Sequence, residues 1–234
     1  MGKIGKPAPM PNTGKLEMLA LQLADSAFPS GSFAHSGGIE AARQWGEIRS
    51  EESLKHFLET AIRQAPFGTL PFLVAAYRKT DSFADLDQLC HAVLSNHVAR
   101  QSSSTQGRSL LATAVRVFNL PAINQLQQDT KDQDLPAHLA PVFGALTLHL
   151  GIPLDKSLQV FLYTLLRDLV SAAIRLNIIG PHAGQRLLVE LAPELELAAR
   201  QSVELELADI AQTAPLVEIL QVNHDRLYSR LFQS

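Results

Sequence analysis

The sequence predicts an all-α protein, a single-domain bundle of about eight to ten helices. Apolar residues recur at spacings of three and four along most of the chain, as in helices that bury one face. Residues that cap helices stand before several of these segments. No segment shows the alternating apolar and polar pattern of a strand bounded by turns.

The first half of the chain carries four segments with helical spacing. Each places its apolar side chains on one face, which could then be buried. Ser50 and Asp81 fit as N-caps of two of them, and Thr69 precedes a Leu70-Pro71 start. The expected helices are one around Leu16–Leu23, then Glu51–Gln64, a helix that starts at Leu70, and Phe83–Leu94.

The second half continues the helical pattern, and one of its helices is apolar on nearly every side. Asp155–Leu176 is interrupted only by a narrow polar stripe, so we expect it to be the central helix. The stripe is either the edge of this helix that meets water, or a polar seam along an interface or channel. The other expected helices are Leu110–Phe118, His138–Leu150 and Glu194–Ile210, and the stripe consists of Thr164, Asp168, Ser171 and Arg175.

The domain organisation is one helical domain over residues 16–234, preceded by a flexible tail over residues 1–15. Gln125–Asp134 is so polar that we expect an exposed loop between two helical halves. Residues 223–234 form a conditionally ordered tail. Burying its four apolar side chains contributes about 6–12 kcal/mol, while ordering its backbone costs about 8–16 kcal/mol. The terms nearly cancel, so the tail either stays loose until a partner binds or forms a terminal helix of the core.

Composition excludes several classes of protein. The 234 residues carry 20 basic and 23 acidic groups, which gives no electrostatic reason to bind nucleic acid. One cysteine cannot form an internal disulfide, which favours a reducing compartment. No apolar run approaches the roughly 18 residues that span a bilayer, and no signal peptide is found. We expect a cytoplasmic protein that does not enter a membrane.

The motifs of common catalytic centres are absent or lack their context. Ala34-His35-Ser36-Gly37-Gly38 resembles the nucleophile elbow of a serine hydrolase, which is the alternative function. That elbow needs a preceding strand, and the sequence predicts none. No P-loop, no HxxxH and no paired CxxC is present, so we expect no enzyme activity and no metal or cofactor bound by this chain alone.

Three segments are unusual for a helical protein and are candidate partner contacts. Asp25–Glu40 is rich in serine, glycine and proline, yet Phe28 and Phe33 would anchor it. Arg100–Ser109 places small and polar residues inside a helical stretch, as on a solvated face or a surface that another backbone approaches closely. The C-terminal NHDRLYSRLFQS combines helical apolar spacing with three basic residues, counting the histidine with the two arginines.

At these same segments the sequence resembles a known family, urease accessory protein F. The matching pieces are LQLADSAFPSGSFAHSGGIEAA, ARQSSSTQGRSLL, LVSAAIRLNIIGPHAGQRLL and HDRLYSRLFQS, in the family's order over residues 16–234. The resemblance implies an all-α homodimer that is not an enzyme. It also implies a complex with urease accessory protein D (also called H) and the GTPase urease accessory protein G. That complex delivers nickel to apo-urease, with GTP bound to the partner.

The resemblance also suggests which residues contact partners. Glu40 closes a motif that would contact the GTPase, and Arg230 matches the terminal arginine of a tail that orders on binding protein D. Many relatives carry tyrosine at the position of Phe33, so a hydrogen bond from Arg230 to that site is not expected here. The polar stripe that ends at Arg175 would line a nickel path. The candidate partner-binding residues are Phe33, His35, Ser36, Glu40, Arg100, Gln106, Arg108, Arg226, Tyr228, Arg230 and Phe232.

Overall fold

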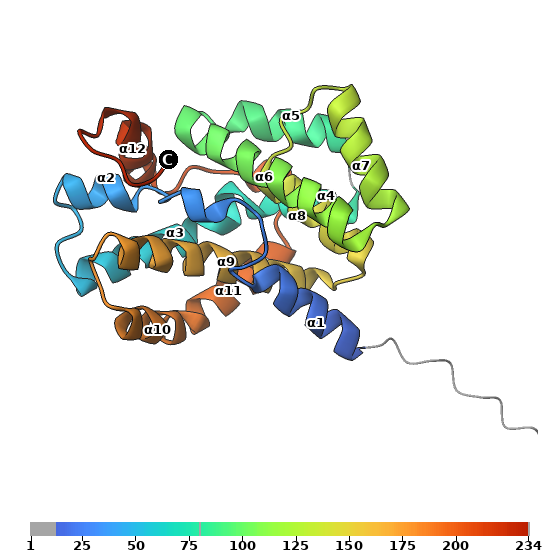
Figure 1. Cartoon of the computed structure of the whole chain (residues 1–234). Coiled ribbons are helices and arrows are strands. Elements are labelled where there is room, and N and C mark those ends of the chain that lie inside the picture. The colour runs from blue at the N-terminus through green and yellow to red at the C-terminus, as the bar shows by residue number, and fades with distance from the viewer. Residues whose placement is uncertain (1–12, 80, 234) are drawn as a thin grey trace, which may run out of the picture.

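The computed structural model describes residues 13–79 and 81–233, and this part of the chain is helical without a strand (Figure 1). The all-α prediction is therefore confirmed, with more helices than expected because the short ones carry too few turns for a periodic pattern. The elements are α1 (Thr13–Ala24), η1 (Ser32–Ala34), α2 (Ile39–Gln44), α3 (Glu51–Gly68), α4 (Leu70–Arg78), α5 (Phe83–Val93), α6 (His97–Phe118), α7 (Pro121–Asp132), α8 (Leu139–Leu150), α9 (Leu154–Arg175), α10 (Pro181–Glu190), α11 (Ala192–Val203), η2 (Leu207–Asp209), α12 (Pro215–Val222) and η3 (Asn223–Arg226).

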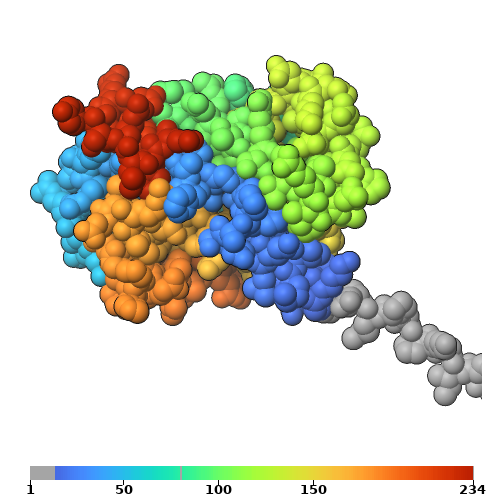
Figure 2. Space-filling view, in the orientation of Figure 1, coloured from blue at the N-terminus to red at the C-terminus, as the bar shows by residue number. Residues whose placement is uncertain are grey.

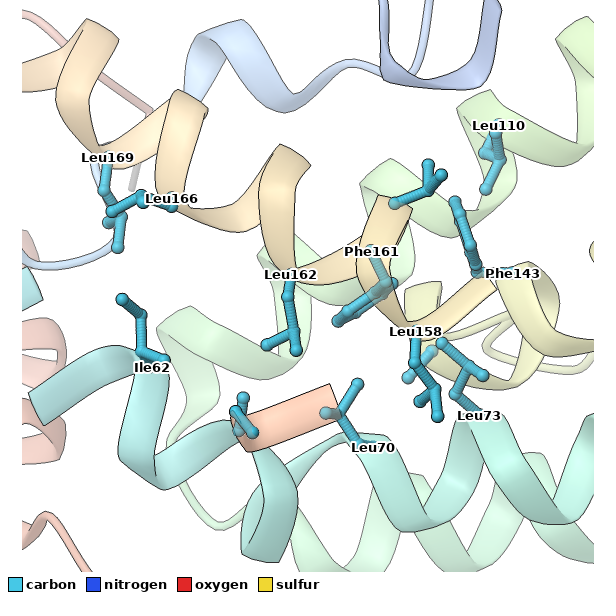
Figure 3. Packing of buried hydrophobic residues seen from close by; sticks show 14 of the residues in the cluster. Ile62, Leu70, Leu73, Leu110, Phe143, Leu158, Phe161, Leu162, Leu166 and Leu169 are labelled. Atoms are coloured by element: carbon cyan, nitrogen blue, oxygen red, sulfur yellow. The ribbon is translucent and has the colours of Figure 1, made fainter. Parts of the chain in front are cut away.

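Helix α9 is the centre of the fold, as its nearly uniform apolar character predicts. It contacts α1, α2, α3, α4, α8, α10 and α11. Its leucines point toward buried side chains of α3 and α4, while its Phe161 packs edge-on against Phe143 of α8 with ring centroids 5.3 Å apart (Figure 3). This helix positions the functional site, because its C-terminal half lies under both ends of the chain.

The length and composition of α9 bear on the expectation that the chain does not enter a membrane. Within the described residues, Leu154–Arg175 is long and apolar enough to cross a bilayer, with a mean hydropathy of 1.3 over the best window. The sequence contains no uninterrupted apolar run of that length, but the mean hydropathy over an 18-residue window of α9 is high enough for a membrane span. Because 56% of the window is buried inside the fold, α9 behaves as a core helix.

Helix starts agree with the capping prediction at two of three positions. Ser50 caps α3 by accepting from Ser53 N, and Thr69 precedes α4 with Pro71 in its first turn. Asp81 is wrong as a cap, because Ser82 occupies that position and accepts a hydrogen bond from Asp85 N at 3.1 Å.

The polar segment Gln125–Asp134 is not an exposed loop, and that prediction is wrong. Most of it belongs to α7, which buries Ile123, Leu126 and Thr130 on one face. Glutamine side chains on the outer face donate to aspartates one turn later, as from Gln125 Nε2 to Asp129 Oδ1 at 2.7 Å. Because only three residues of this helix are buried, its many polar residues give the sequence the composition of a loop.

Two other boundaries differ from the prediction. Helix α6 begins at His97 rather than Leu110, so the serine-rich segment is helical throughout. Helix α11 ends at Val203, and the chain then turns through η2 instead of continuing to Ile210.

The two ends of the described chain differ in their surroundings. Residues 1–12, most of the expected tail, lie outside the described residues, while Gly14 and Lys15 already belong to α1. At the other end, residues after α12 fold back beside the N-terminal loop and α2, where Figure 2 shows the two segments in contact. Whether this tail is ordered only with a partner stays a prediction.

Candidate functional site

The loop between α1 and α2 is shaped by glycines and held by α6. Gly37 and Gly38 have positive φ values of 60° and 95°, and a Cβ on Gly37 would lie 2.5 Å from the Leu169 side chain. Side chains of α6 reach the other end of the loop: Ser109 Oγ and Thr113 Oγ1 donate to Pro29 O at 3.2 and 2.8 Å. The loop is therefore anchored to α6 and α9. Phe28 is buried and anchors the loop as expected, whereas Phe33 is exposed, so the expectation that it also anchors the loop to the core is wrong.

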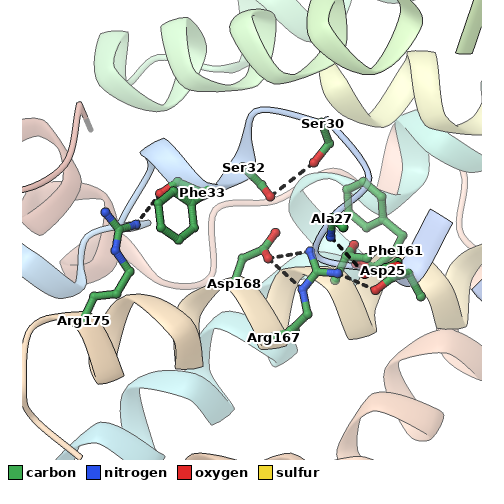
Figure 4. A network of polar contacts seen from close by, with 11 residues as sticks. Asp25, Ala27, Ser30, Ser32, Phe33, Phe161, Arg167, Asp168 and Arg175 are labelled. Carbon is green, nitrogen blue, oxygen red and sulfur yellow. Dashed lines mark hydrogen bonds and ion pairs between the residues drawn. The ribbon is translucent and has the colours of Figure 1, made fainter. Parts of the chain in front are cut away.

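The polar stripe of α9 lies under this loop (Figure 4). Asp168 accepts from Arg167 Nη2 at 2.6 Å and has a side-chain hydrogen bond with Ser32 of η1. Burial raises the pKa of the Asp168 carboxyl, although Arg167 and Ser32 act in the opposite direction. Arg167 also donates to Ala24 O at the end of α1. Asp168 of the stripe thus faces the chain's own loop rather than open solvent. Whether the whole stripe is a seam or a channel stays a prediction.

A cavity of about 370 Å³ begins beside this stripe and extends between α3, α5, α6, α8 and α12. Thr164 and Asp168 of the stripe line it, whereas Ser171 and Arg175 do not. His35 and Gln106 from the candidate partner-binding set also reach its wall. Most of the remaining lining is apolar.

The C-terminal tail is fixed to α2 through Glu40. This carboxylate is 3% exposed and accepts hydrogen bonds from Leu231 N at 2.6 Å, Phe232 N at 3.2 Å and His224 Nε2 at 3.1 Å. Gln44, one turn further along α2, donates from Nε2 to Ser229 O at 2.7 Å. Two side chains of one short helix therefore hold the backbone of the tail.

Arg175 joins the loop, the tail and the central helix. Its guanidinium donates from Nη1 to Phe33 O at 2.5 Å (Figure 4). The same group lies 3.7 Å from the centroid of the Phe33 ring and 4.2 Å from that of Phe232. Cation–π contacts of this kind stabilise by about 0.5–2 kcal/mol each, more where water is excluded. Gln233 N completes the junction by donating to Ala34 O at 2.8 Å.

The junction brings the loop, α2 and the tail together and leaves exposed side chains on each of them, which we call the loop–tail face: Phe33, Trp45, Tyr228, Arg230 and Leu231. Tyr228 is fully exposed, Phe33 is 70% exposed and Leu231 is 55% exposed. Arg230 also lies on the surface, where its Nη1 is 3.6 Å from Asp225 Oδ1. Exposed aromatic side chains beside arginines are typical of protein-binding hot spots.

The serine-rich segment of α6 contacts another segment of the same chain, rather than the partner protein that was expected. Arg108 donates from Nη2 to Leu135 O and from Nε to Pro136 O, both at 3.2 Å. A Cβ on Gly107 would lie 2.0 Å from Ala137 O. The close approach of another backbone is therefore real, but that backbone is the turn before α8 of the same chain.

Two chemical alternatives fail on geometry. Ser36 is fully buried and no strand precedes it in the described chain, so the nucleophile elbow of the serine hydrolase does not exist here. Within residues 13–79 and 81–233 no three histidine, cysteine or carboxylate side chains gather as metal ligands. Cys90 is a buried core thiol whose pKa is raised by burial.

The sequence profile of the UreF family matches residues 48–192, which is more than half of the chain. The chain belongs to the UreF family. Its relatives include urease accessory protein F of Oryza sativa subsp. indica, 34% identical over 90% of this chain and 82% of the rice protein. The protein of the same name from Arabidopsis thaliana is 35% identical over 91% of this chain and 90% of its own length. Urease accessory protein UreF of Bacillus sp. (strain TB-90) is 34% identical over 91% and 96%.

The family membership confirms the resemblance read from the sequence and carries a general role in urease maturation. The relatives are named accessory proteins rather than enzymes. The candidate residues occupy different parts of this UreF-family chain. Most residues from the two ends of the chain come together, whereas those from α6 lie apart from them.

The candidate partner-binding residues fall into three groups. Phe33, Tyr228 and Arg230 lie on the loop–tail face, and Arg226 is exposed on η3 beside it. Glu40, Ser36 and Phe232 are buried, and His35 is half-buried with a pKa lowered first by burial and then by His224. The α6 residues Arg100, Gln106 and Arg108 lie on a different helix, where Gln106 Nε2 donates to Ser102 Oγ at 2.9 Å.

Sequence reasoning missed several residues that build the face. Arg167 and Gln44 hold the loop and the tail, and Trp45 is 47% exposed beside them. His224, which no motif marks, pairs with Glu40. Arg167 could have been predicted as a functional residue, because it is an arginine inside an otherwise apolar helix. No local pattern marks Gln44, because its partner lies 185 residues further along the chain.

Proposed function

We propose that this chain is a non-enzymatic adaptor that bridges urease accessory protein D (or H) and the GTPase urease accessory protein G. In this role it regulates the GTP-dependent delivery of nickel to apo-urease. It works in the cytoplasm as a homodimer and binds no cofactor of its own, with nickel as the cargo of the complex. The proposal extends the general role of the UreF family in urease maturation.

The observation that carries the proposal is the loop–tail face. It presents Phe33, Tyr228 and Leu231 to solvent on a backbone that Glu40, Gln44 and Arg175 hold in place. In the structure the tail is held in this way without a partner, in contrast to the loose tail that is one of the two alternatives from the sequence. A surface held in advance loses little conformational entropy on binding, which favours a tight complex. An adaptor needs such a surface, whereas an enzyme would need a reactive group in a cleft.

The cavity supports a path for nickel beside the polar stripe. Thr164 and Asp168 line it with oxygen atoms, and His35 lines it with an imidazole, the ligand type that suits nickel. We expect Thr164→Ala combined with Asp168→Asn to lower the nickel content of urease while the accessory complex still forms. Ser171→Ala, at a stripe position away from the cavity, is the matched control. Unchanged nickel loading in the double variant would refute the path.

In this proposal the chain regulates the GTPase without inserting an arginine into the active site of that protein. Arg43, Arg100 and Arg108 are near the family motifs, but Arg43 Nη1 donates to Ile48 O at 3.3 Å and Arg108 holds two carbonyls. An arginine finger must be free to enter the partner's active site. Organising the GTPase through surface contacts fits these side chains better than supplying a catalytic group.

Urease activation in cells tests the proposal. The chain is expressed with urease and the other accessory proteins in a host that lacks its own F protein, and urease activity and bound nickel are measured. We expect wild type to restore activity and Tyr228→Ala with Leu231→Ala to lose most of it. Val189→Ala is the control, because Val189 is 75% exposed on α10, away from the loop–tail face. Failure of the wild type to activate urease would contradict the proposal.

A further inference from the structure

Glu40 was expected to contact the GTPase, and its surroundings argue against this. The side chain is 3% exposed and both carboxylate oxygens face groups of the same chain. Oε1 accepts from Leu231 N at 2.6 Å, and Oε2 accepts from Phe232 N at 3.2 Å and from His224 Nε2 at 3.1 Å. A partner could reach this carboxylate only after the tail had left.

We propose that Glu40 is an internal latch, a positioning residue that holds the C-terminal tail on α2 and so builds the loop–tail face without touching a partner. The inference rests on the proposed function for what the face binds, but not for how the face is held. It concerns three contacts between residues 184 to 192 positions apart in the chain.

The chemistry of the contacts explains why this position needs a carboxylate. All three partners donate: two are backbone amides and the third is an imidazole nitrogen. An ionised carboxylate only accepts, through both oxygens, so every donor finds an acceptor. A glutamine of the same shape would turn an NH₂ group toward a donor, which breaks at least one contact and leaves polar groups unpaired.

The latch also determines which tail side chains face the solvent. Since Glu40 holds the consecutive amides of Leu231 and Phe232, the orientation of this backbone is fixed. Phe232 then points inward, 5% exposed against the Arg175 guanidinium, while Leu231 points outward, 55% exposed. Losing Glu40 would therefore remove Leu231 and Tyr228 from their positions on the face, although neither side chain was changed.

Hydrogen exchange of the full-length chain, read by mass spectrometry, tests the latch without any partner. We expect Glu40→Gln to speed exchange of the tail amides at Leu231 and Phe232 at least tenfold, with α8 and α9 unchanged. Glu47→Gln is the matched control, because Glu47 is exposed in the turn after α2. Tail exchange at the wild-type rate in a folded Glu40→Gln protein would overturn the latch.

A second variant covers the case in which Glu40→Gln unfolds the chain. Leu231→Pro removes the amide that donates to Glu40 Oε1, and it lies in the terminal segment, outside every helix, at an exposed side chain. We expect faster exchange at Phe232 and Gln233 in this variant. Wild-type rates there would again contradict the latch.

Binding to accessory protein D separates a latch from a direct contact. We expect Glu40→Gln to weaken the complex because it releases the tail. Leu231→Pro should weaken it at least as much, because it releases the same tail and also removes the exposed Leu231 side chain. Weaker binding by Glu40→Gln with unchanged tail exchange would mean that Glu40 itself touches the partner. If even the wild type fails to bind protein D, the proposed function fails, and the exchange result still decides whether the latch exists.

Discussion

Single residues of α5 and α6 decide how closely the turn before α8 packs against them. Asp87 of α5 accepts from Ala137 N and His138 N, both at 2.7 Å, and Arg108 holds the two carbonyls before them. Ala137 itself adopts a positive φ of 57°, which an alanine rarely does. The surrounding hydrogen bonds maintain this turn, and Gly107 leaves room for it.

Gly107→Ala should lower the free energy of unfolding by about 3 kcal/mol, because the new Cβ meets backbone atoms that cannot rotate away. Ala137 O would be 2.0 Å from it and the carbonyl carbon of His138 2.8 Å. Urea unfolding measures the loss. Gly180→Ala serves as the control, since its Cβ would meet no atom within 4 Å. A Gly107→Ala protein as stable as wild type would contradict this packing.

His138 should make the protein less stable as the pH falls. Burial, with smaller effects from His91, Arg100 and Arg108, lowers its pKa from 6.5 to about 4. The unfolded chain therefore binds more protons between these two values, so stability is lost as the pH drops from about 6.5 toward 4. A shift of this size corresponds to on the order of 3 kcal/mol.

The test compares unfolding of wild type and His138→Gln at pH 7 and pH 4.5. Wild type should lose more stability than the variant over this range, since glutamine does not titrate. The buried Asp87, whose raised pKa favours proton binding by the folded state, acts in the opposite direction in both proteins. His182→Gln, at an exposed histidine, should behave as wild type. Equal pH dependence of wild type and His138→Gln would refute the assignment.

At the scale of elements, sequence patterns predict helices with wide apolar faces and miss α7. Helices with wide apolar faces, such as α3, α5 and α9, were predicted within a few residues. Helix α7 was missed because a run of glutamines and aspartates outweighs a narrow buried face of Ile123, Leu126 and Thr130. Its outer polar residues support the helix through hydrogen bonds one turn apart, such as Gln128 Nε2 to Asp132 Oδ1 at 2.7 Å.

Gln128→Pro distinguishes a helix from a loop at this place. In the interior of α7 a proline removes a backbone hydrogen bond and clashes with the preceding turn, so we expect a loss of about 3 kcal/mol. Gln128 is exposed, and Gln128→Ala should therefore change stability by less than about 1 kcal/mol. Thermal unfolding of both variants gives the answer. An equal melting temperature for the two would mean that the segment is not a helix in solution.

At the scale of the whole molecule, the candidate site depends on contacts that no local pattern reveals. The sequence indicated that the loop before α2 and the C-terminal tail are unusual, and it suggested a partner contact for each. It could not indicate that they pair with each other, because Glu40 and Leu231 are 191 positions apart and only the packing of α2, α9 and α12 brings them together. The Arg175 contact with two phenylalanine rings depends on the same packing.

The central claim is that the loop–tail face binds accessory protein D, and light scattering of co-expressed proteins tests it most directly. The measurement compares the full-length chain with a version that ends at His224, which keeps α12 but lacks Tyr228, Leu231 and Phe232. We expect a stable complex with the full-length chain and none with the shortened one. A complex of unchanged mass with the shortened chain, or no complex of the full-length chain with a folded protein D, would contradict the account.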